Sequence, residues 1–288
     1  MDKPLIDVKD LRIRFESAHG SHEAVRGISF TIGREKVGIV GESGSGKSLT
    51  GRSLLKLTPK GAKITAAHMR FRGTDLLAAG EKEMRTIRGN HISMILQDPK
   101  YSLNPLMRIG NQIVEAYRLH HKARPAEAKT KALAMLESVH IREPERVFDL
   151  FPHEVSGGMG QRIMIAMMLI PEPDLIIADE PTSALDVTVR RQVLTILDEL
   201  VSRRGTGLMF ISHDLNLVAS FCDRVLVMYA GRIMEDLPAR DLHSARHPYT
   251  QALLESLPRL DHPVDELKVP LRDPSWLNGS VYHNGALI

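Results

Sequence analysis

The sequence predicts an α/β fold with a mostly parallel β-sheet, and three observations support this prediction. Residues 36–40 have the apolar character of a short buried strand that runs into a glycine-rich loop and then into a helix. After residue 157, apolar stretches of strand length alternate with stretches of helical periodicity, which is typical of a parallel sheet covered by helices. Between these two parts, the pattern is helical from residue 99 to about residue 152.

The N-terminal residues predict an antiparallel sheet. Residues 5–15 alternate apolar and polar side chains after a short break, as in a half-buried strand. Residues 20–22, Gly-Ser-His, form a turn signal, and residues 24–32 have the pattern of a second strand. Residues 61–71 return to strand-like alternation. This sheet is expected to lead into the buried strand at residues 36–40.

The remaining elements follow from apolar periodicity. Pro125 opens one helix at a position where its missing N–H is harmless. That helix has an apolar stripe at helical spacing, formed by Ala132, Met135, Leu136 and Val139. Further helices are expected at 49–56, 81–88, 109–119, 160–170, 187–203 and 216–220, and further strands at 91–96, 174–179, 207–212 and 224–229.

Composition limits the class of protein. Among 288 residues, 25% are charged and 43% hydrophobic, as in ordinary soluble globular proteins, and the net charge of +3 alone does not indicate a nucleic-acid surface. The single cysteine, Cys222, excludes an internal disulfide and a metal site of clustered cysteines, and fits a reducing cytosol. The longest apolar runs, such as residues 163–170, are far shorter than the ~20 residues of a membrane span. The N-terminus lacks the apolar core of a signal peptide.

The glycine-rich loop carries the clearest chemical signal. Its sequence, Gly41-Glu42-Ser43-Gly44-Ser45-Gly46-Lys47-Ser48, fits the phosphate-binding motif G-x-x-x-x-G-K-[ST]. Such a loop and the helix that begins near Leu49 direct backbone N–H groups at anionic oxygens. Lys47 is expected to reach the β- and γ-phosphates of a nucleotide, and the Ser48 hydroxyl to ligate Mg²⁺. A Gly/Ser-rich linker, the alternative, lacks a strand and a helix in this order.

Two carboxylates follow a second buried strand. Residues 175–178 are apolar and run directly into Asp179 and Glu180, which a parallel strand would present at the edge where α/β proteins bind ligands. Asp179 suits a partner of Mg²⁺, and Glu180 suits the group that orients or deprotonates an attacking water. The alternative is a helix-capping pair before Pro181. The phosphate-binding motif elsewhere in the chain argues against that alternative.

A third motif, Ser156-Gly157-Gly158-Met159-Gly160-Gln161-Arg162, opens an apolar helical stretch. A Ser-Gly-Gly turn that leads into a helix offers another N-terminus for an anion. Considered alone, the motif predicts a helix cap with flexible glycines. Considered with the other two motifs, it predicts a second phosphate clamp.

In this combination and order, the motifs resemble those of the ATP-binding subunits of ABC transporters over about residues 5–258. The resemblance implies a P-loop NTPase (RecA-like) core with an N-terminal antiparallel β-subdomain and a helical subdomain at about residues 98–157. It implies one nucleotide-binding domain over residues 1–258. Residues 259–288, rich in Pro, Asp and Gly, are then a loosely ordered C-terminal extension.

The resemblance also implies the roles of individual residues. Ser156, Gly157 and Gly158 match the signature motif that contacts ATP bound by the opposite subunit. Asp186, in Ser183-Ala184-Leu185-Asp186, matches the loop that crosses the dimer interface. Gln97 matches a glutamine that senses Mg²⁺ and the membrane partner; Ser48, Gln97 and Asp179 are thus the expected metal ligands.

Two further residues take their roles from the resemblance. His213 matches the switch histidine, whose alternative is a buried structural histidine. Phe15 matches an aromatic residue that stacks on adenine, whose alternative is a core strand residue. Glu180, His213 and Gln97 are the expected catalytic residues.

Four segments resemble the importers of oligopeptides, dipeptides and nickel: Gln97-Asp98-Pro99, Ser102-Leu103-Asn104-Pro105, Phe151-Pro152-His153-Glu154 and His247-Pro248-Tyr249-Thr250. Two departures from that subfamily are visible. Gly160 stands where an arginine is usual, which removes a charge and costs helix propensity. Residues 259–288 contain no cysteine, which excludes the iron–sulfur cluster that a cysteine cluster there would hold.

The resemblance implies an ATP-hydrolysing subunit of an importer, with ATP and Mg²⁺ as cofactors. Its expected partners are a second, different ATP-binding subunit, two membrane permease subunits and, indirectly, a periplasmic solute-binding protein, with no nucleic acid. The expected location is the cytoplasmic face of the bacterial inner membrane. Peptide is the first solute expected, and nickel or another metal chelate is the alternative.

Two other classes of protein are weighed against the importer. A DNA-repair or chromosome-associated ATPase shares the core, but such chains insert zinc modules or long coiled coils, for which this chain has no room. A regulator without turnover is disfavoured by the intact Lys47, Asp179, Glu180 and His213.

Overall fold

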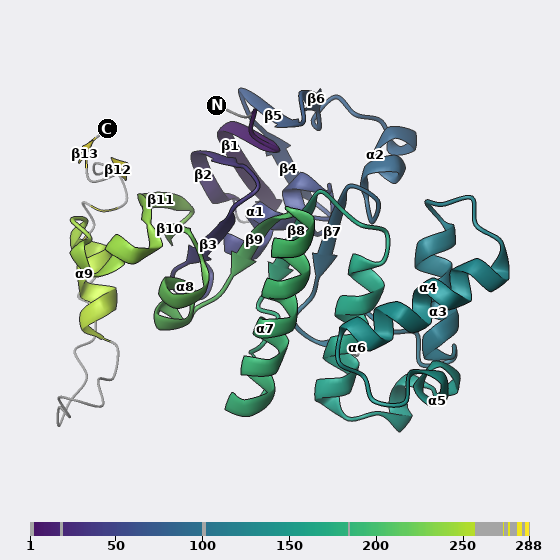
Figure 1. Ribbon diagram of the computed structural model, residues 1–288. Coiled ribbons are helices and arrows are strands. Elements are labelled where there is room, and N and C mark those ends of the chain that lie inside the picture. The colour runs from purple at the N-terminus through teal and green to yellow at the C-terminus, as the bar shows by residue number, and fades with distance from the viewer. Residues whose placement is uncertain are drawn as a thin grey trace. The chain divides into compact units, whose positions relative to one another are not determined.

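The computed structural model describes residues 3–17, 20–99, 102–183, 185–256, 273, 276, 281–283 and 286–287. The chain divides into two compact units, and Figure 1 labels their helices and strands. The first, here called the N/C unit, joins residues 1–79 to residues 209–288, and the second, the middle unit, contains residues 80–208. The boundary expected at residue 258 stays a prediction, because most of residues 259–288 lie outside the described residues.

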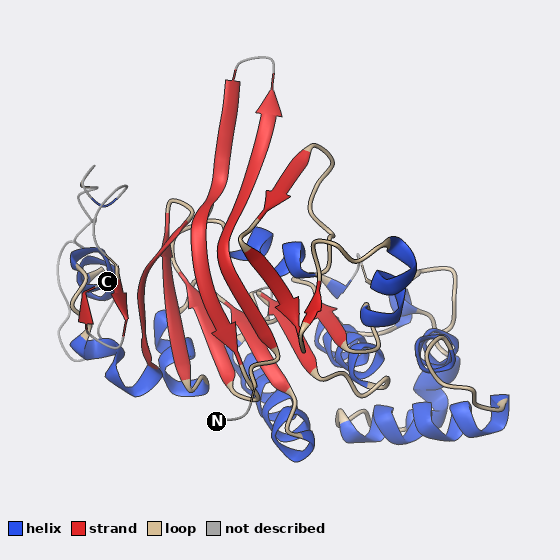
Figure 2. Cartoon of the chain, turned by 90° about the horizontal axis from the view of Figure 1, so that it is seen from above, coloured by secondary structure: helices blue, strands red, loops and turns tan. Residues whose placement is uncertain are grey.

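The N/C unit contains the antiparallel sheet that the sequence predicts. Its strands are β1 (Ile6–Ser17), β2 (Gly20–Ile32), β4 (Ala62–Thr65), β5 (His68–Phe71) and β6 (Thr74–Asp75). The order is β2-β1-β5-β6, with β4 also paired to β1, and every pair is antiparallel. Figure 2 shows the long paired strands in red. Alternating residues of β1 such as Leu11 and Ile13 are fully buried, so one face of the sheet contributes to the core.

Two details of this sheet differ from the sequence-based expectation. Residues 20–22 are not a turn: they belong to β2 and pair with β1 as far as Ser17↔Gly20. They are exposed, and an exposed strand end needs no apolar side chains, so the polar composition was misleading. The strand expected at 61–71 is two strands, because β4 pairs with residues 12–15 of β1 and β5 with residues 6–9. The register of β1 shifts between these segments, where Asp10 has a φ of 52°.

The N/C unit also contains parallel strands. β3 (Lys36–Val40) and β10 (Arg224–Tyr229) pair in parallel, and β11 (Arg232–Pro238) pairs with β10 antiparallel. The last residues of β9 (Gly207–Ile211) lie beside β3, since the Ser212 N–H donates to the Ile39 carbonyl oxygen at 3.1 Å. β12 (Tyr282–His283) and β13 (Ala286–Leu287) extend this sheet beyond β11.

Helices of the N/C unit flank these strands. They are α1 (Lys47–Leu54), α8 (Leu215–Phe221), a 3₁₀ helix (Ala239–Ser244) and α9 (Pro248–Glu255). α8 packs on β3, and Cys222 follows it directly. The Cys222 side chain is buried, and this burial raises the pKa of the thiol far above its usual value. A side chain at Gly38 of β3 would collide with Val218, since an added Cβ would lie 2.2 Å from its Cγ1 atom.

The middle unit contains the helices that the sequence predicts, which are α2 (Glu81–Ile87), α3 (Ile109–Arg118), α4 (Pro125–Ser138), α6 (Gly157–Leu169) and α7 (Val187–Arg204). It also contains α5 (Pro144–Asp149) and a 3₁₀ helix (Pro152–Glu154), which were not predicted as separate elements. The stripe of Ala132, Met135, Leu136 and Val139 is buried, as expected. In Figure 1, α3, α4, α5 and α6 lie together, and α6 also packs on β7 (Ile92–Ile95). Within the described part of the chain, no helix has the length and apolar character needed to cross a bilayer.

Candidate functional site

The loop between β3 and α1 is shaped by two glycines. Gly41 has a φ of 147° and Gly46 a φ of 97°, values that side chains resist. A Cβ at Gly41 would lie 2.0 Å from the Met228 carbonyl oxygen, and one at Gly46 would lie 2.8 Å from the Ala24 carbonyl oxygen. The backbone therefore passes so close to its neighbours that only glycine fits. This close wrapping is what a loop that encloses phosphate oxygens requires.

Lys47 occupies the inside of that loop. Its side chain is 6% exposed, and its ammonium donates to the carbonyl oxygens of Gly41, at 2.8 Å, and Glu42, at 2.7 Å. α1 begins at Lys47, two residues before the predicted start, and its N-cap residue, Gly46, supplies no side-chain cap. The first N–H groups of a helix attract anions. The Lys47 ammonium and the start of α1 therefore both offer positive charge to a phosphate chain bound in the loop.

Two further predicted residues of the N/C unit lie on a strand or directly after one. Phe15 lies in β1, opposite His22 of β2 and Ala62 of β4, and is partly exposed. His213 follows β9 in a tight turn, in which the Asp214 N–H donates to the Ser212 hydroxyl at 3.0 Å. His213 is exposed, so it is not the buried structural histidine that was the alternative.

In the middle unit, two parallel strands bring three predicted residues to one edge. β7 and β8 (Leu175–Asp179) pair with Ile95 opposite Ala178. Gln97, two residues after β7, and the carboxylates at the end of β8 therefore lie at the same edge, where α/β proteins bind ligands. Asp179 is 4% exposed. Such a buried carboxylate at a strand end suits a fixed ligand rather than a solvated surface charge.

Glu180 has an unusual backbone. Its φ is 49°, in the left-handed region that residues other than glycine rarely adopt. The Ser183 N–H and hydroxyl both donate to the Glu180 carbonyl oxygen, at 3.3 and 3.2 Å, and so hold the turn. Strained backbone of this kind persists where the surroundings enforce it, here through the two hydrogen bonds from Ser183. The turn fixes the direction in which the Glu180 carboxylate leaves the strand.

The Ser-Gly-Gly motif forms the start of α6. Ser156 is the N-cap, its hydroxyl accepting from the Met159 N–H at 3.3 Å, so the helix begins three residues earlier than predicted. Ser156 and Gly157 are exposed. A Cβ at Gly158 would lie 2.7 Å from Val189 of α7. This glycine therefore allows the two helices to approach closely.

Asp186 caps the next helix. Its carboxylate accepts from the N–H groups of Thr188 and Val189 at 3.0 Å each, at the start of α7, and the residue is exposed. Ala184, in the same predicted loop, lies outside the described residues.

The known proteins that are similar to this chain agree on one family. The family model described as "ABC transporter" matches residues 25–183, more than half of the chain. A probable peptide ABC transporter ATP-binding protein of Sinorhizobium fredii is 50% identical over 88% of this chain and 77% of its own length. The oligopeptide transport ATP-binding protein OppD of Salmonella typhimurium is 46% identical over 95% of this chain and 82% of its own. The chain belongs to the ABC transporter family.

Solved structures of ABC cassettes share its fold. A dimeric bacterial ABC transporter cassette, MJ0796, matches with a TM-score of 0.73 and 26% identity over 82% of this chain and 99% of that one. The same cassette bound to ADP and phosphate matches with the same TM-score at 24% identity. The P-loop NTPase fold is thereby confirmed. The chain is an ATP-binding ABC ATPase.

The motif analysis assigned no role to Gln161. In this ABC ATPase, Gln161 is 1% exposed, and its side-chain N–H donates to the Pro181 carbonyl oxygen, directly after Glu180. The bond connects the start of α6 to the turn that holds the expected catalytic carboxylate. The sequence did contain a signal, because Gln161 stands at the start of an apolar helical stretch. The side-chain amide of a buried glutamine must find a hydrogen-bond partner.

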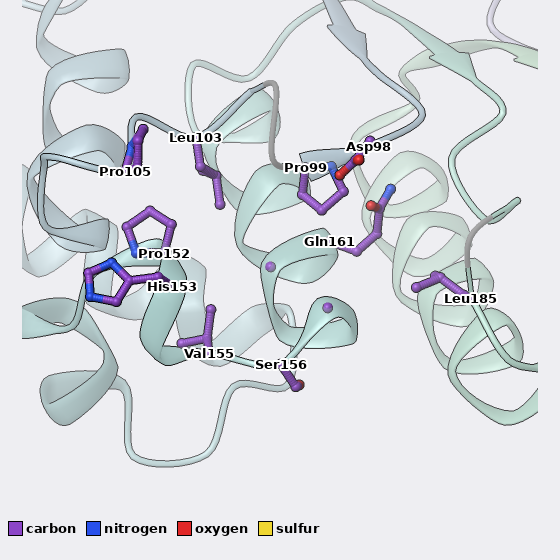
Figure 3. A pocket seen from close by; sticks show the side chains of 12 residues that line it. Asp98, Pro99, Leu103, Pro105, Pro152, His153, Val155, Ser156, Gln161 and Leu185 are labelled. Atoms are coloured by element: carbon purple, nitrogen blue, oxygen red, sulfur yellow. The ribbon is translucent and has the colours of Figure 1, made fainter.

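A pocket of about 570 Å³ lies beside the start of α6 (Figure 3). Its wall is mostly apolar, with Pro99 and Leu103 on one side and Val155 on another. Ser156, Gly157 and Gly160 of the signature region also line it. The segment after the predicted Mg²⁺ sensor Gln97 and the start of α6 therefore share one cavity of the ABC ATPase.

Gly160 offers a test of helix stability. A Cβ there would meet only Pro99, at 3.7 Å, an ordinary contact distance. Gly160→Ala is therefore expected to raise the free energy of unfolding by about 0.5–1 kcal/mol, because alanine loses less backbone entropy in a helix. Urea unfolding of the two proteins measures this difference. Gly158→Ala, the matched change two residues earlier, should instead destabilise the ABC ATPase, since its Cβ collides with Val189. A loss of stability in both would contradict this reasoning.

Proposed function

We propose that this chain is the energy-coupling subunit of an importer for di- or oligopeptides, driven by ATP hydrolysis. The observation that carries the proposal is the 46–50% identity, over 88–95% of the chain, to two proteins named for peptide transport. A dipeptide transport ATP-binding protein of Lactococcus lactis, 43% identical over 96% of this chain, supports the same solute class. None of these relatives is named for DNA repair or for nickel, which disfavours both alternatives.

In the proposed reaction, the phosphate chain of ATP lies in the loop at residues 41–48. Lys47 contacts the β- and γ-phosphates, and Phe15 stacks on the adenine. The Ser48 hydroxyl, the Gln97 amide oxygen and the buried Asp179 carboxylate would hold Mg²⁺, and these hard oxygen donors fit that cation. When bound, the cation would neutralise charge on the phosphates.

Glu180 then acts as the general base that takes a proton from the attacking water. The strained turn at φ 49° supports this role, because it fixes the carboxylate at the end of β8. His213, exposed on its turn, donates a hydrogen bond to the γ-phosphate. Placing base and water in one fixed geometry is a large part of such catalysis.

A second ATP-binding subunit, different from this chain, completes the site. Ser156, Gly157, Gly158 and Asp186 would contact the ATP held by that subunit. The exposure of Ser156, Gly157 and Asp186 supports this assignment, because a residue that acts on another subunit must be accessible. Closure over ATP excludes water and adds donors around the γ-phosphate.

Two permease subunits anchor the complex at the cytoplasmic face of the bacterial inner membrane. A periplasmic solute-binding protein delivers the solute to these permeases from the opposite side of the membrane. The pocket beside α6 is the surface we assign to a permease. Leu106, which follows the pocket residue Pro105 in the sequence, is 86% exposed, which suits burial against an apolar partner. Since Ser156 and Gly157 line the same pocket, a movement of the permease would reach the residues that clamp ATP.

Solute uptake tests the proposed function. Host cells that lack this chain are expected to lose uptake of radiolabelled trialanine and to regain it when the wild-type chain is supplied. A chain with Glu180→Gln should not restore uptake, because binding without hydrolysis does not drive transport. Accumulation of radioactive nickel is measured in the same cells. Loss of nickel rather than peptide uptake would reassign the solute to the metal-chelate class.

A further inference from the structure

Tyr249 connects the C-terminal part of the N/C unit to the phosphate loop. It lies in the first turn of α9 and is fully buried. Its hydroxyl oxygen accepts a hydrogen bond from the Glu42 backbone N–H at 3.2 Å, across 207 positions of sequence. The segment His247-Pro248-Tyr249-Thr250 thus reaches the loop, although neither the family motifs nor the proposed reaction gives it a role.

The bond from Tyr249 falls on a peptide group that Lys47 also holds. The carbonyl oxygen of the Gly41–Glu42 peptide accepts from the Lys47 ammonium at 2.8 Å, while the N–H of the same peptide donates to Tyr249. Oxygen and hydrogen of a trans peptide point in opposite directions. The two side chains therefore hold the first peptide of the loop from both ends and fix its rotation.

Tyr249 is itself firmly held. The His247 Nδ1 atom accepts from the Tyr249 N–H at 3.0 Å, and burial lowers the pKa of His247, which keeps the ring neutral and able to accept. The Glu235 carboxylate, 1% exposed, accepts from the N–H groups of Arg246, at 2.7 Å, and His247, at 3.2 Å. Charge-assisted bonds of this kind are stronger than neutral ones.

Aromatic rings complete the support. The Tyr249 ring lies 4.5 Å from that of Tyr229 and 5.7 Å from that of Trp276, measured between centroids. Such ring pairs restrict side-chain movement in addition to burying surface. The hydroxyl therefore meets the loop from a fixed position.

We propose that Tyr249 is a positioning residue of the phosphate loop, and that it keeps the Gly41–Glu42 peptide in the orientation that binds a triphosphate. The proposal rests on the proposed binding of ATP at residues 41–48. When the phosphates attract the Lys47 ammonium away from the Gly41 carbonyl oxygen, Tyr249 continues to hold the N–H of that peptide. A binding loop that is already oriented avoids an ordering cost when the ligand arrives.

Tyr249→Phe removes the hydroxyl and keeps the ring. Because one neutral hydrogen bond that orients the loop is lost, the affinity of the full chain for a fluorescent ATP analogue is expected to fall about fivefold. Tyr229→Phe is the matched control, since it changes a buried ring of the same cluster. Within the described residues, the Tyr229 hydroxyl makes no hydrogen bond to the loop. The control should bind the analogue as the wild type does.

The single tryptophan gives a readout that a purely structural role would not change. Trp276 contacts both Tyr229 and Tyr249, so its emission is expected to change when ATP binds. This nucleotide-dependent change should persist in Tyr229→Phe and disappear in Tyr249→Phe, while the emission without nucleotide verifies that the variants are folded. Glu235→Gln, which loosens the support without touching the loop, should weaken binding in the same direction.

Three results would contradict either the positioning role of Tyr249 or the proposed function, and each result identifies which of the two fails. Wild-type affinity in both Tyr249→Phe and Glu235→Gln would refute the positioning role. Equal losses in Tyr249→Phe and Tyr229→Phe would also refute it, because the hydroxyl would then have no specific effect. A wild-type chain that fails to bind the analogue would instead refute the proposed function.

Discussion

Glu180→Gln is expected to lower ATP turnover by about 10²–10⁴-fold and to leave ATP binding intact, if Glu180 is the general base proposed above. The amide has nearly the same size as the carboxylate but cannot take a proton from water. The backbone of the turn, held by Ser183, should be unaffected. Phosphate release from the reconstituted transporter measures turnover, and a fluorescent ATP analogue measures binding. Because the bound ATP is not consumed, the variant should also remain dimeric longer in the presence of ATP.

Glu172→Gln provides the matched control for this experiment. Glu172 is also a glutamate of the middle unit in the left-handed region, with a φ of 62°, but its exposed side chain forms an ion pair with Arg204 at 3.6 Å. Such exposed pairs contribute little to stability, so turnover should stay at the wild-type level. Undiminished phosphate release by Glu180→Gln would show that another group is the base.

Gly41→Ala is expected to abolish ATP binding and to lower the free energy of unfolding by about 3 kcal/mol. The added Cβ would lie 2.0 Å from the Met228 carbonyl oxygen, an atom of β10 that cannot rotate away. The φ of 147° adds backbone strain of about 1–3 kcal/mol for any residue with a side chain. Urea unfolding measures the stability, and titration with the ATP analogue measures the binding.

Gly44→Ala distinguishes collision from strain. Gly44 also has a positive φ, 81°, but an added Cβ there would have no atom within 4 Å. Only the backbone cost of about 1–2 kcal/mol should remain, and the loop should still close. If the two alanine variants lost the same stability, the contact between Gly41 and β10 would not be what shapes the loop.

The core elements were predictable because local pattern and tertiary environment agree. The apolar runs of β3 and β8 are buried as expected, and Pro125 and the apolar stripe identified α4. β11 was missed because it contains Glu235 and Asp236, both buried. Asp236 is paired with Arg224 at 3.0 Å, and Glu235 accepts from the backbone before α9. Such compensation depends on distant residues and cannot be recognised in a local pattern.

The same distinction applies to the site. The motifs identified residues whose contacts lie within their own segment, such as Lys47, which donates to Gly41 and Glu42, and the Ser156 cap, which accepts from Met159. The contacts made by Gln161 and Tyr249 span 20 and 207 positions of sequence. Their partners are a carbonyl oxygen and an N–H group, which every residue type offers. The sequence therefore contains the residues that make these contacts, but no local pattern in it identifies their partners.

The burial of Cys222 has a practical consequence. The chain has one cysteine, and that thiol is enclosed behind α8, with its deprotonation suppressed. A maleimide dye needs an accessible thiolate, so the wild-type protein should react very slowly with such reagents. A cysteine introduced at an exposed position outside the site, such as 60 or 131, would then be a unique attachment point. Opening and closing of the assembled transporter could be followed by energy transfer between two dyes without first removing the native thiol.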